Sequence, residues 1–337
     1  MELQTNFSLK NYNTFGIEAK AREFVSVQNT TELRTVLEQN KSKKKFILGG
    51  GSNMLLTKDI DALVIHVDLK GKKIIKETDD FAWVESQAGE NWHEFVIWTI
   101  DQKLGGLENM SLIPGNVGTT PVQNIGAYGT EIKDTFDSCE AMTIENQEMK
   151  TFTKAECHFG YRESVFKNEA KDQYIITSVV FKLTKRNHKI NTSYGDITAE
   201  LAKNNITNPT LKNVSDAVIA IRKSKLPDPK DLGNSGSFFK NPILLKSDFE
   251  KIHQLFPEMK CYEISETEVK VPAGWLIEQA GFKGKRFGDA GIHKNQALVL
   301  VNYGNATGQE ILNVSKNIQE TVFKIYGISI EAEVNVI

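Results

Sequence analysis

The 337-residue chain has the composition of an ordinary globular protein, with 40% hydrophobic and 25% charged residues. Its formal net charge of −2 argues against a general nucleic-acid-binding protein, and no apolar run of about 18 residues predicts a transmembrane helix. The three cysteines, Cys139, Cys157 and Cys261, have no paired spacing, which fits a reducing compartment and argues against a disulfide framework or a zinc site. Residues 1–6 do not resemble a secretory signal, so we expect a cytoplasmic protein of two or three domains.

Short apolar runs separated by glycine-rich turns predict strands in the first half of the chain. The expected elements are strands at 46–48, 63–67, 81–84 and 174–183, a helix near 92–100 and a hairpin at 141–152. This is an α+β pattern with mostly local connections.

A polar and basic stretch at 184–213 is expected to be a boundary region. Asn213 or Ser215 is expected to cap the helix that follows, and Pro227 to stop it, because proline lacks an N–H donor and restricts the residue before it.

Helix and strand alternate over the remainder of the chain. A capping box at 307–310 predicts the start of a helix that Gly327 closes. Alternating apolar and polar residues from 328 to 336 then predict a single C-terminal strand. A helix at 275–280 and a strand at 297–301 are expected before them.

Two glycine-rich segments are candidates for ligand binding. The loop at 49–56 begins with three glycines that follow an expected strand, so bare N–H groups can approach an anion closely. The segment at 113–129 has four glycines, two prolines and several neutral polar groups, but no charged side chain. Neither segment is a Walker loop or a GxGxxG turn, and on spacing alone each is also readable as a structural turn.

The remaining candidates have structural interpretations when each is taken alone. Ser237 lies between a glycine and two aromatic residues, but it lacks the G-x-S-x-G elbow of a hydrolase. Arg162 is readable as a surface arginine paired with a neighbouring residue, and Glu333 as a solvated charge on the polar face of the last strand. His93 and His293 have no partner at metal-binding spacing, and we expect no metal site.

Taken in order, these motifs resemble the UDP-N-acetylenolpyruvoylglucosamine reductases, the MurB family of flavoenzymes in bacterial peptidoglycan synthesis. The resemblance runs almost end to end and includes a tyrosine-bearing loop, Ser193-Tyr194-Gly195-Asp196, that marks one form of the family. The motifs that carry it lie at 13–16, 49–56, 113–129, 161–167, 225–229, 236–242, 273–277 and 331–334.

The resemblance implies an α+β fold, with a two-lobed FAD-binding domain of the vanillyl-alcohol-oxidase type and a C-terminal α+β substrate domain. It implies that the last strand either stays in the substrate domain or returns to the FAD-binding domain. The expected divisions are lobe 1 at 1–70, lobe 2 at 71–187, a substrate-loop boundary region at 188–212 and the substrate domain at 213–337.

The resemblance also implies FAD as cofactor and NADPH as co-substrate, with the first loop near the FAD diphosphate. The implied FAD-binding residues are Gly49, Gly50, Gly51, Ser52, Asn53, Met54, Pro114, Gly115, Gly118, Gln123, Asn124, Ile125, Gly126, Ala127 and Tyr128.

In the implied reaction, hydride passes from NADPH to FAD and then to UDP-N-acetylglucosamine enolpyruvate. Arg162 matches the residue that stabilises charge on the enolpyruvyl group, and Glu333 matches the catalytic glutamate. Ser237 matches the proton donor to the carbanionic carbon. Positions that hold the UDP-sugar are matched by Tyr194, Lys225, Asn241 and Gln296.

Two alternatives stay open at this point. Another FAD oxidoreductase of the same fold would not need Ser237, Arg162 and Glu333 together. A catalytically silent nucleotide-sugar binding protein would keep Lys225, Asn241 and Tyr194 but could lose the flavin. We expect a monomer that binds neither nucleic acid nor membranes.

Overall fold

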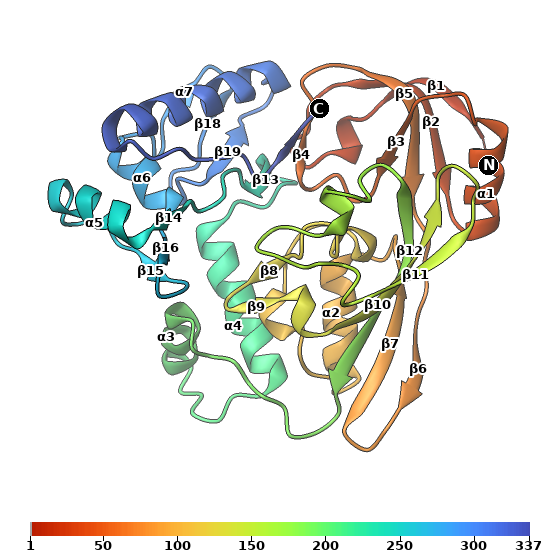
Figure 1. Cartoon of the computed structure of the whole chain (residues 1–337), viewed down its shortest axis with the longest axis horizontal. Coiled ribbons are helices and arrows are strands. Elements are labelled where there is room, and N and C mark those ends of the chain that lie inside the picture. Colours follow the sequence, from red (N-terminus) through yellow and green to blue (C-terminus); the bar gives the residue numbers. More distant parts are fainter. Residues whose placement is uncertain (1) are drawn as a thin grey trace. The chain divides into compact units, whose positions relative to one another are not determined.

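The computed structural model describes residues 2–337, which divide into two compact units (Figure 1). Unit 1 contains 21–50 and 60–224 together with the residues up to Phe7, and unit 2 contains 8–20, 51–59 and 225–337. The units therefore divide at Ser224 and Lys225, not at the expected residue 213, because the intervening helix packs within unit 1. Two N-terminal segments expected in lobe 1 also belong to unit 2.

The first sheet of unit 1 contains parallel strands. Its order is β1 (Gln4–Ser8), β2 (Lys20–Val27), β5 (Ile60–Val67) and β3 (Lys45–Leu48), with β5 parallel to both β2 and β3. The helix α1 (Thr30–Gln39) connects β2 to β3 and buries Leu33, Val36 and Leu37 against the sheet. The expectation of mostly local connections is wrong here, because parallel neighbours require a crossover.

The second sheet of unit 1 is antiparallel throughout. Its order is β11 (Met149–Thr153), β10 (Phe136–Thr143), β12 (Tyr174–Thr184), β7 (Phe81–Gln87) and β6 (Lys72–Glu77). The helix α2 (Trp92–Asp101) packs against it through Trp92 and Phe95, whose rings contact Phe181. The expected hairpin, helix and buried strand are thereby confirmed.

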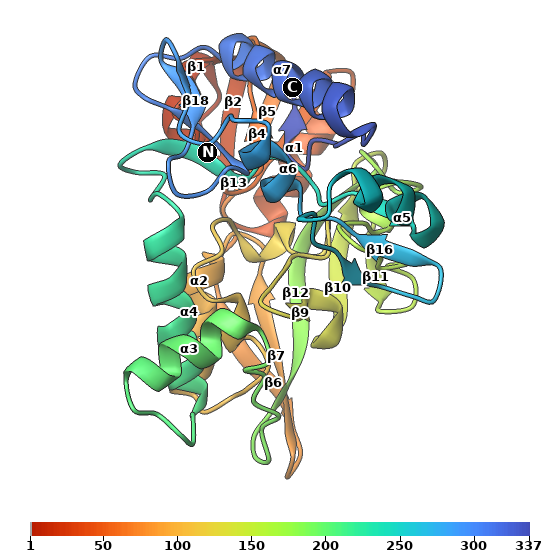
Figure 2. The same ribbon diagram turned by 90° about the vertical axis from the view of Figure 1, so that its left-hand side faces the viewer.

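Two helices of unit 1 pack against each other, α3 (Gly195–Lys203) and α4 (Leu211–Lys225) (Figures 1 and 2). The start of α4 differs from the expectation that Asn213 or Ser215 caps it. The hydroxyl of Thr210 accepts from the N–H of Asn213 at 3.3 Å, and the Asn213 side chain accepts from the N–H of Thr210 at 3.0 Å. Thr210 therefore caps the helix, and Asn213 is the third residue of the capping box, whose side chain bonds back to the backbone of Thr210. The helix ends before Pro227, as predicted.

Small elements complete unit 1. They are the hairpin β8 (Gly126–Ala127) and β9 (Thr130–Glu131), and the 3₁₀ turns η2 (Glu108–Met110), η3 (Val117–Thr119), η4 (Ile132–Asp134) and η5 (Val165–Lys167).

Unit 2 is built on the antiparallel sheet β13 (Gly233–Ser237), β19 (Val299–Asn302), β18 (Ala290–Ile292) and β17 (Arg286–Phe287). A smaller sheet contains β14 (Ile243–Leu245), β16 (Glu268–Lys270) and β15 (Tyr262–Glu263). The other elements are η1 (Lys10–Tyr12), α5 (Lys246–Leu255), α6 (Ala273–Gln279) and α7 (Gly308–Tyr326).

The longest helix of unit 2, α7, runs across the main sheet (Figure 1). It begins at the predicted capping box of Thr307 and Glu310 and ends at Gly327, whose φ is +68°. Its buried side chains, among them Ile311 and Ile318, face the core. Within residues 2–337, no helix is both long and apolar enough to cross a bilayer.

The predicted single strand at 328–336 is wrong, because the chain changes its backbone partner there. The N–H of Glu333 donates to the Phe238 carbonyl at 2.7 Å. After that, β20 (Asn335–Val336) pairs in parallel with β4 (Met54–Leu55). Burial alternates only from Ile328 to Glu331, and Ala332 and Glu333 are both half-buried, so the alternating sequence pattern did not predict the change of partner.

Candidate active site

Gly49 and Gly50, at the end of one segment of unit 1, allow close contact with the segment 113–129 of the same unit. A Cβ atom at Gly50 would lie 2.9 Å from the Cα of Gly115, and one at Gly49 would lie 2.6 Å from the Cγ2 of Thr119. The sequence predicted glycines that expose N–H groups to an anion. In the structure, the lack of a side chain at these two glycines lets their backbone lie close to the segment 113–129.

The segment 113–129 is anchored near both of its ends. At the first end, the N–H of Trp92 donates to the Gly115 carbonyl at 3.0 Å, and the indole of Trp92 donates to the Met110 carbonyl at 2.9 Å. At the second end, the Asn109 amide donates to the Tyr128 carbonyl at 3.1 Å. The segment is therefore a preformed backbone surface.

Asn124, a predicted FAD-binding residue, uses its side chain inside the protein. It is fully buried and has a φ of +44°. Its amide donates to the Glu131 carboxylate at 3.0 Å and to the Gly160 carbonyl at 2.8 Å, and its oxygen accepts from the N–H of Lys133. The side chain of Asn124 therefore orders the segment.

Arg162 lies against the same segment. Its Nη2 atom donates to the Gly126 carbonyl at 2.8 Å, and its guanidinium lies 5.4 Å from the ring centroid of Tyr161. The backbone of Arg162 is left-handed, with a φ of +58°. The structure thus brings a predicted catalytic residue to the predicted cofactor segment.

The ring of Tyr194 also contacts this segment. It packs edge-on against the Tyr128 ring, with 5.5 Å between the centroids, and 48% of Tyr194 is exposed. Burial raises the pKa of Tyr128 above its ordinary value, so its phenol stays protonated at neutral pH. The exposed ring of Tyr194 therefore lies beside the more buried ring of Tyr128.

Unit 2 brings Ser237, Glu333 and Asn53 into one neighbourhood. Ser237 is exposed at the end of β13, where it pairs with Val299. The N–H of Glu333 bonds to the residue after Ser237, and the Asn53 amide donates to the Glu333 carbonyl at 3.3 Å. The exposed hydroxyl is accessible to a ligand.

The predicted substrate residues of unit 2 lie on elements adjoining β13. The Asn241 side-chain oxygen accepts from the N–H of Ala273 at 2.9 Å, at the start of α6. The Gln296 oxygen accepts from the N–H of Leu298 at 3.3 Å. The ring of His293 hydrogen-bonds to the backbone of Lys225, while burial lowers the pKa of His293.

Sequence reasoning missed the residues that hold the segment 113–129 from outside. Asn109 and Trp92 act on partners about twenty positions away, and Arg222 donates to the Leu112 carbonyl across 110 positions. No short-range pattern marks such residues. The motif 113–129 that they hold is visible in the sequence, but its distant partners are not.

The donor set described above fits FAD. Residues 113–128 of unit 1 offer backbone amides and neutral polar side chains and no cation, which is a donor set that a dinucleotide cofactor can use. Among the described residues, no cluster of His, Cys, Asp or Glu could hold a metal ion.

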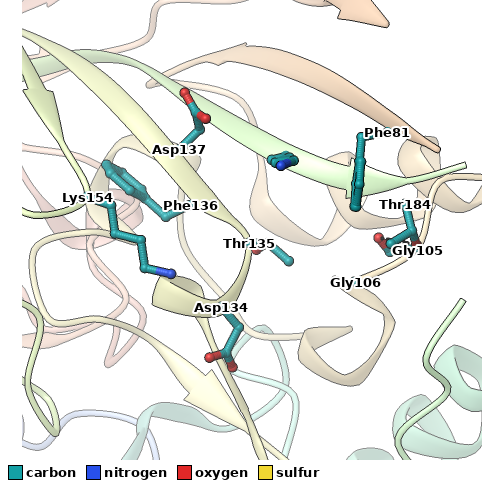
Figure 3. A pocket seen from close by; sticks show the side chains of 10 residues that line it. Phe81, Gly105, Gly106, Asp134, Thr135, Phe136, Asp137, Lys154 and Thr184 are labelled. Carbon is teal, nitrogen blue, oxygen red and sulfur yellow. Dashed lines mark hydrogen bonds between the residues drawn. The ribbon is translucent and has the colours of Figure 1, made fainter. Parts of the chain in front are cut away.

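A separate cavity of about 470 Å³ lies in unit 1 (Figure 3). Phe81, Asp134 and Lys154 are among its lining residues, together with Lys182. None of the predicted catalytic, cofactor or substrate residues lines it.

Comparisons with known proteins agree with this arrangement. Residues 21–152 match the FAD binding domain, and residues 228–337 match the C-terminal domain of UDP-N-acetylenolpyruvoylglucosamine reductase. The fold resembles that of MurB from Thermus caldophilus, with a TM-score of 0.70 and 24% identity over 99% of this chain and 98% of that one. The predicted α+β fold with an FAD-binding domain is confirmed.

Two curated relatives cover the full length. UDP-N-acetylenolpyruvoylglucosamine reductase from Flavobacterium johnsoniae is 82% identical over 337 residues, which is 100% of both chains. The reductase from Pseudomonas putida is 46% identical over 99% of both chains. The chain described here belongs to the UDP-N-acetylenolpyruvoylglucosamine reductase (MurB) family of FAD-dependent oxidoreductases.

Proposed function

We propose that this protein reduces UDP-N-acetylglucosamine enolpyruvate to UDP-N-acetylmuramate, a step of peptidoglycan precursor synthesis, with NADPH as the reductant. The observation that carries this proposal is the 82% identity to a reductase of that name over the whole chain. The retained FAD-binding domain argues against a nucleotide-sugar binding protein without catalysis.

Bound FAD supplies the hydride transfer from NADPH to the substrate. The loops at 49–54 and 113–128 hold it, mainly through backbone groups. Their contact at Gly50 and Gly115 and the anchors from Trp92 and Asn109 support a surface that is already formed before FAD binds.

Arg162 binds the carboxylate of the enolpyruvyl group. A planar guanidinium suits a carboxylate by bidentate geometry, and it stabilises the negative charge that develops when hydride adds to the terminal carbon. The bond from its Nη2 atom to Gly126 supports a fixed orientation for this role.

Ser237 donates the proton that completes the reduction. A serine hydroxyl is a weak acid, so its effect depends on placement. Its exposure and its position beside the backbone of Glu333 support this role. Glu333 helps to orient or stabilise the intermediate.

The UDP-sugar is held by Tyr194, Lys225, Asn241 and Gln296. The exposed ring of Tyr194 offers stacking area, and Lys225 offers a cation for the diphosphate. Both nucleotide substrates are charged and do not cross membranes unaided. This supports our further proposal that the enzyme works in the cytoplasm, and we propose that it does so as a monomer.

An anaerobic visible spectrum tests the proposal. The purified protein is titrated first with NADPH and then with UDP-N-acetylglucosamine enolpyruvate. We expect the flavin band to bleach with NADPH and to return only with the enolpyruvyl substrate.

The other outcomes separate the alternatives. A bleached band that this substrate fails to restore would favour another FAD oxidoreductase of the same fold. No flavin band, even after FAD is added, would favour the nucleotide-sugar binding protein.

A further inference from the structure

Leu112 has an unusual backbone conformation at the start of the predicted cofactor segment. Its φ is +60°, in the left-handed region, which a residue with a Cβ atom rarely adopts. Leu112 comes directly before the segment 113–129. The direction in which that segment leaves η2 therefore depends on a conformation that surrounding groups must maintain.

Two side chains hold the two polar backbone atoms of Leu112. The Nδ1 atom of His93, on α2, accepts from the N–H of Leu112 at 3.0 Å. The Nε atom of Arg222, on α4, donates to the Leu112 carbonyl at 3.2 Å. The Leu112 backbone is thus held between two helices.

The same face of α4 also holds the preceding residue. The hydroxyls of Ser111 and Ser215 lie 2.8 Å apart in a buried hydrogen bond. Ser215 and Arg222 are seven positions apart, about two helical turns, so both point to the same side of α4. Arg222 also interacts electrostatically with Tyr128, near the other end of the segment.

We propose that His93 and Arg222 are positioning residues for FAD, because they fix the left-handed turn at Leu112 from which the segment 113–129 extends. This inference rests on the proposed role of that segment in binding FAD. Neither residue needs to touch the reacting atoms, and each acts through the Leu112 backbone.

The His93 bond makes FAD binding sensitive to acid. The Nδ1 atom can accept from Leu112 only while it carries no proton. Burial lowers the pKa of His93 below its ordinary value of 6.5; Arg222 and Lys223 lower it further, and Glu94 opposes them. The bond is therefore intact above pH 6.5 and is lost as the pH falls through the lowered pKa.

The dissociation constant for FAD, measured between pH 5 and pH 8 by flavin fluorescence, tests this proposal. For the unaltered protein, we expect the affinity for FAD to fall as the pH drops below the His93 pKa. Because one proton is taken up, the fall is at most about tenfold for each pH unit. His93→Leu removes the acceptor, so affinity at pH 7.5 should fall by about tenfold and the pH dependence should disappear.

His93→Asn separates positioning from folding. Asparagine offers an oxygen close to the place of Nδ1, and that oxygen does not titrate in this range. We expect most of the affinity at pH 7.5 to return, without the loss in acid. His66→Asn is the matched control: burial also lowers the pKa of His66, which bonds to Ser26 in the first sheet of unit 1. It should leave the pH profile of FAD binding unchanged.

Arg222 is tested through its effect on His93. In Arg222→Met, the pKa of His93 measured by NMR should rise, and FAD should bind about tenfold more weakly. Wild-type affinity and pH profile in His93→Leu would overturn the proposal, as would a persistent acid loss in His93→Asn. These measurements need FAD but no enolpyruvyl substrate. If the expected changes in FAD affinity are found but the reduced flavin is not reoxidised by the enolpyruvyl substrate, the proposed function is refuted and the role of His93 and Arg222 stands.

Discussion

Gly118 in unit 1, itself a predicted FAD-binding residue, and Gly236 in unit 2, directly before Ser237, are glycines for different reasons. A Cβ atom at Gly118 would lie 2.4 Å from the Cβ and 2.9 Å from the Cα of Ala88. Gly236 has no atom within 4 Å of such a Cβ, but its φ is +68°. The first position lacks space, and the second requires a left-handed backbone.

This difference extends to the regions around the two glycines. The segment 113–129 is held by packing and by hydrogen bonds from Trp92 and Asn109, which suits the cofactor surface that we propose for it. Ser237 follows Gly236 in an open position at the end of a strand. The proposed cofactor segment is defined by close contact, whereas the proposed proton donor, Ser237, follows a glycine with a left-handed backbone and is exposed.

Ser237→Ala should have the largest effect on activity and almost none on folding. Loss of the proton donor should slow flavin reoxidation by the enolpyruvyl substrate about 10²- to 10⁴-fold, while reduction by NADPH stays within about twofold. Stopped-flow absorbance follows both half-reactions.

Ser329→Ala, at another exposed serine of unit 2, is the control and should change neither half-reaction. Equal losses in both half-reactions of Ser237→Ala, or a clear drop in stability, would show that Ser237 has a structural role and that the contrast with unit 1 is wrong.

Local signals allowed much of this fold to be predicted from the sequence. The helix α7 was predicted with both ends because its capping box and its closing glycine lie within the helix's own sequence. The hairpin of β10 and β11 was also predicted, because its two strands are neighbours in the sequence. Features that depend on a distant partner were not predicted: the parallel pairing of β5 with β2 and β3, and the change of partner after Glu333.

The candidate site divides along the same line. Its motifs were visible in the sequence, and the contact of Arg162 with Gly126 agrees with their grouping. The internal hydrogen bonds of the Asn124 side chain could not be predicted, because one of its partners is Gly160, 36 positions away. The resemblance supplied the candidate residues, and the structure gave their hydrogen-bond partners.

Gly118→Ala should have the next largest effect, and it acts on folding. The added methyl group meets both a side chain and backbone of Ala88, so the backbone must shift, and we expect the free energy of unfolding to fall by about 3 kcal/mol. Urea denaturation measures this change, and FAD affinity should fall with it.

The double variant Ala88→Gly with Gly118→Ala tests the cause. It removes the nearer of the two clashes, so it should recover part of the lost stability. A single Gly118→Ala variant within about 0.5 kcal/mol of wild type would mean that space is not what requires glycine there.

Tyr194→Phe should have a smaller effect, confined to the substrate. It removes a hydroxyl but keeps the ring that packs against Tyr128. The KM for the enolpyruvyl substrate should rise about three- to tenfold, and the dissociation constant for FAD should stay within about twofold. Tyr262→Phe, at an exposed position of unit 2, should change neither value. Loss of FAD from Tyr194→Phe would instead place this loop among the contacts that hold the cofactor.

Gly236→Ala should have the smallest effect on stability, and it is interpreted by comparison with a control variant, Gly327→Ala. Gly236 and Gly327 share a φ of +68° and have open space where a Cβ would lie, so alanine at either position should lower the free energy of unfolding by about 1 kcal/mol. Gly327 closes α7, away from β13 in the sequence, so only Gly236→Ala should also slow reoxidation by the substrate. If both variants lose the same stability but only Gly236→Ala slows reoxidation, the slower rate would be assigned to a changed orientation of the Ser237 hydroxyl. Equal rates would mean that backbone conformation at Gly236 does not direct the serine.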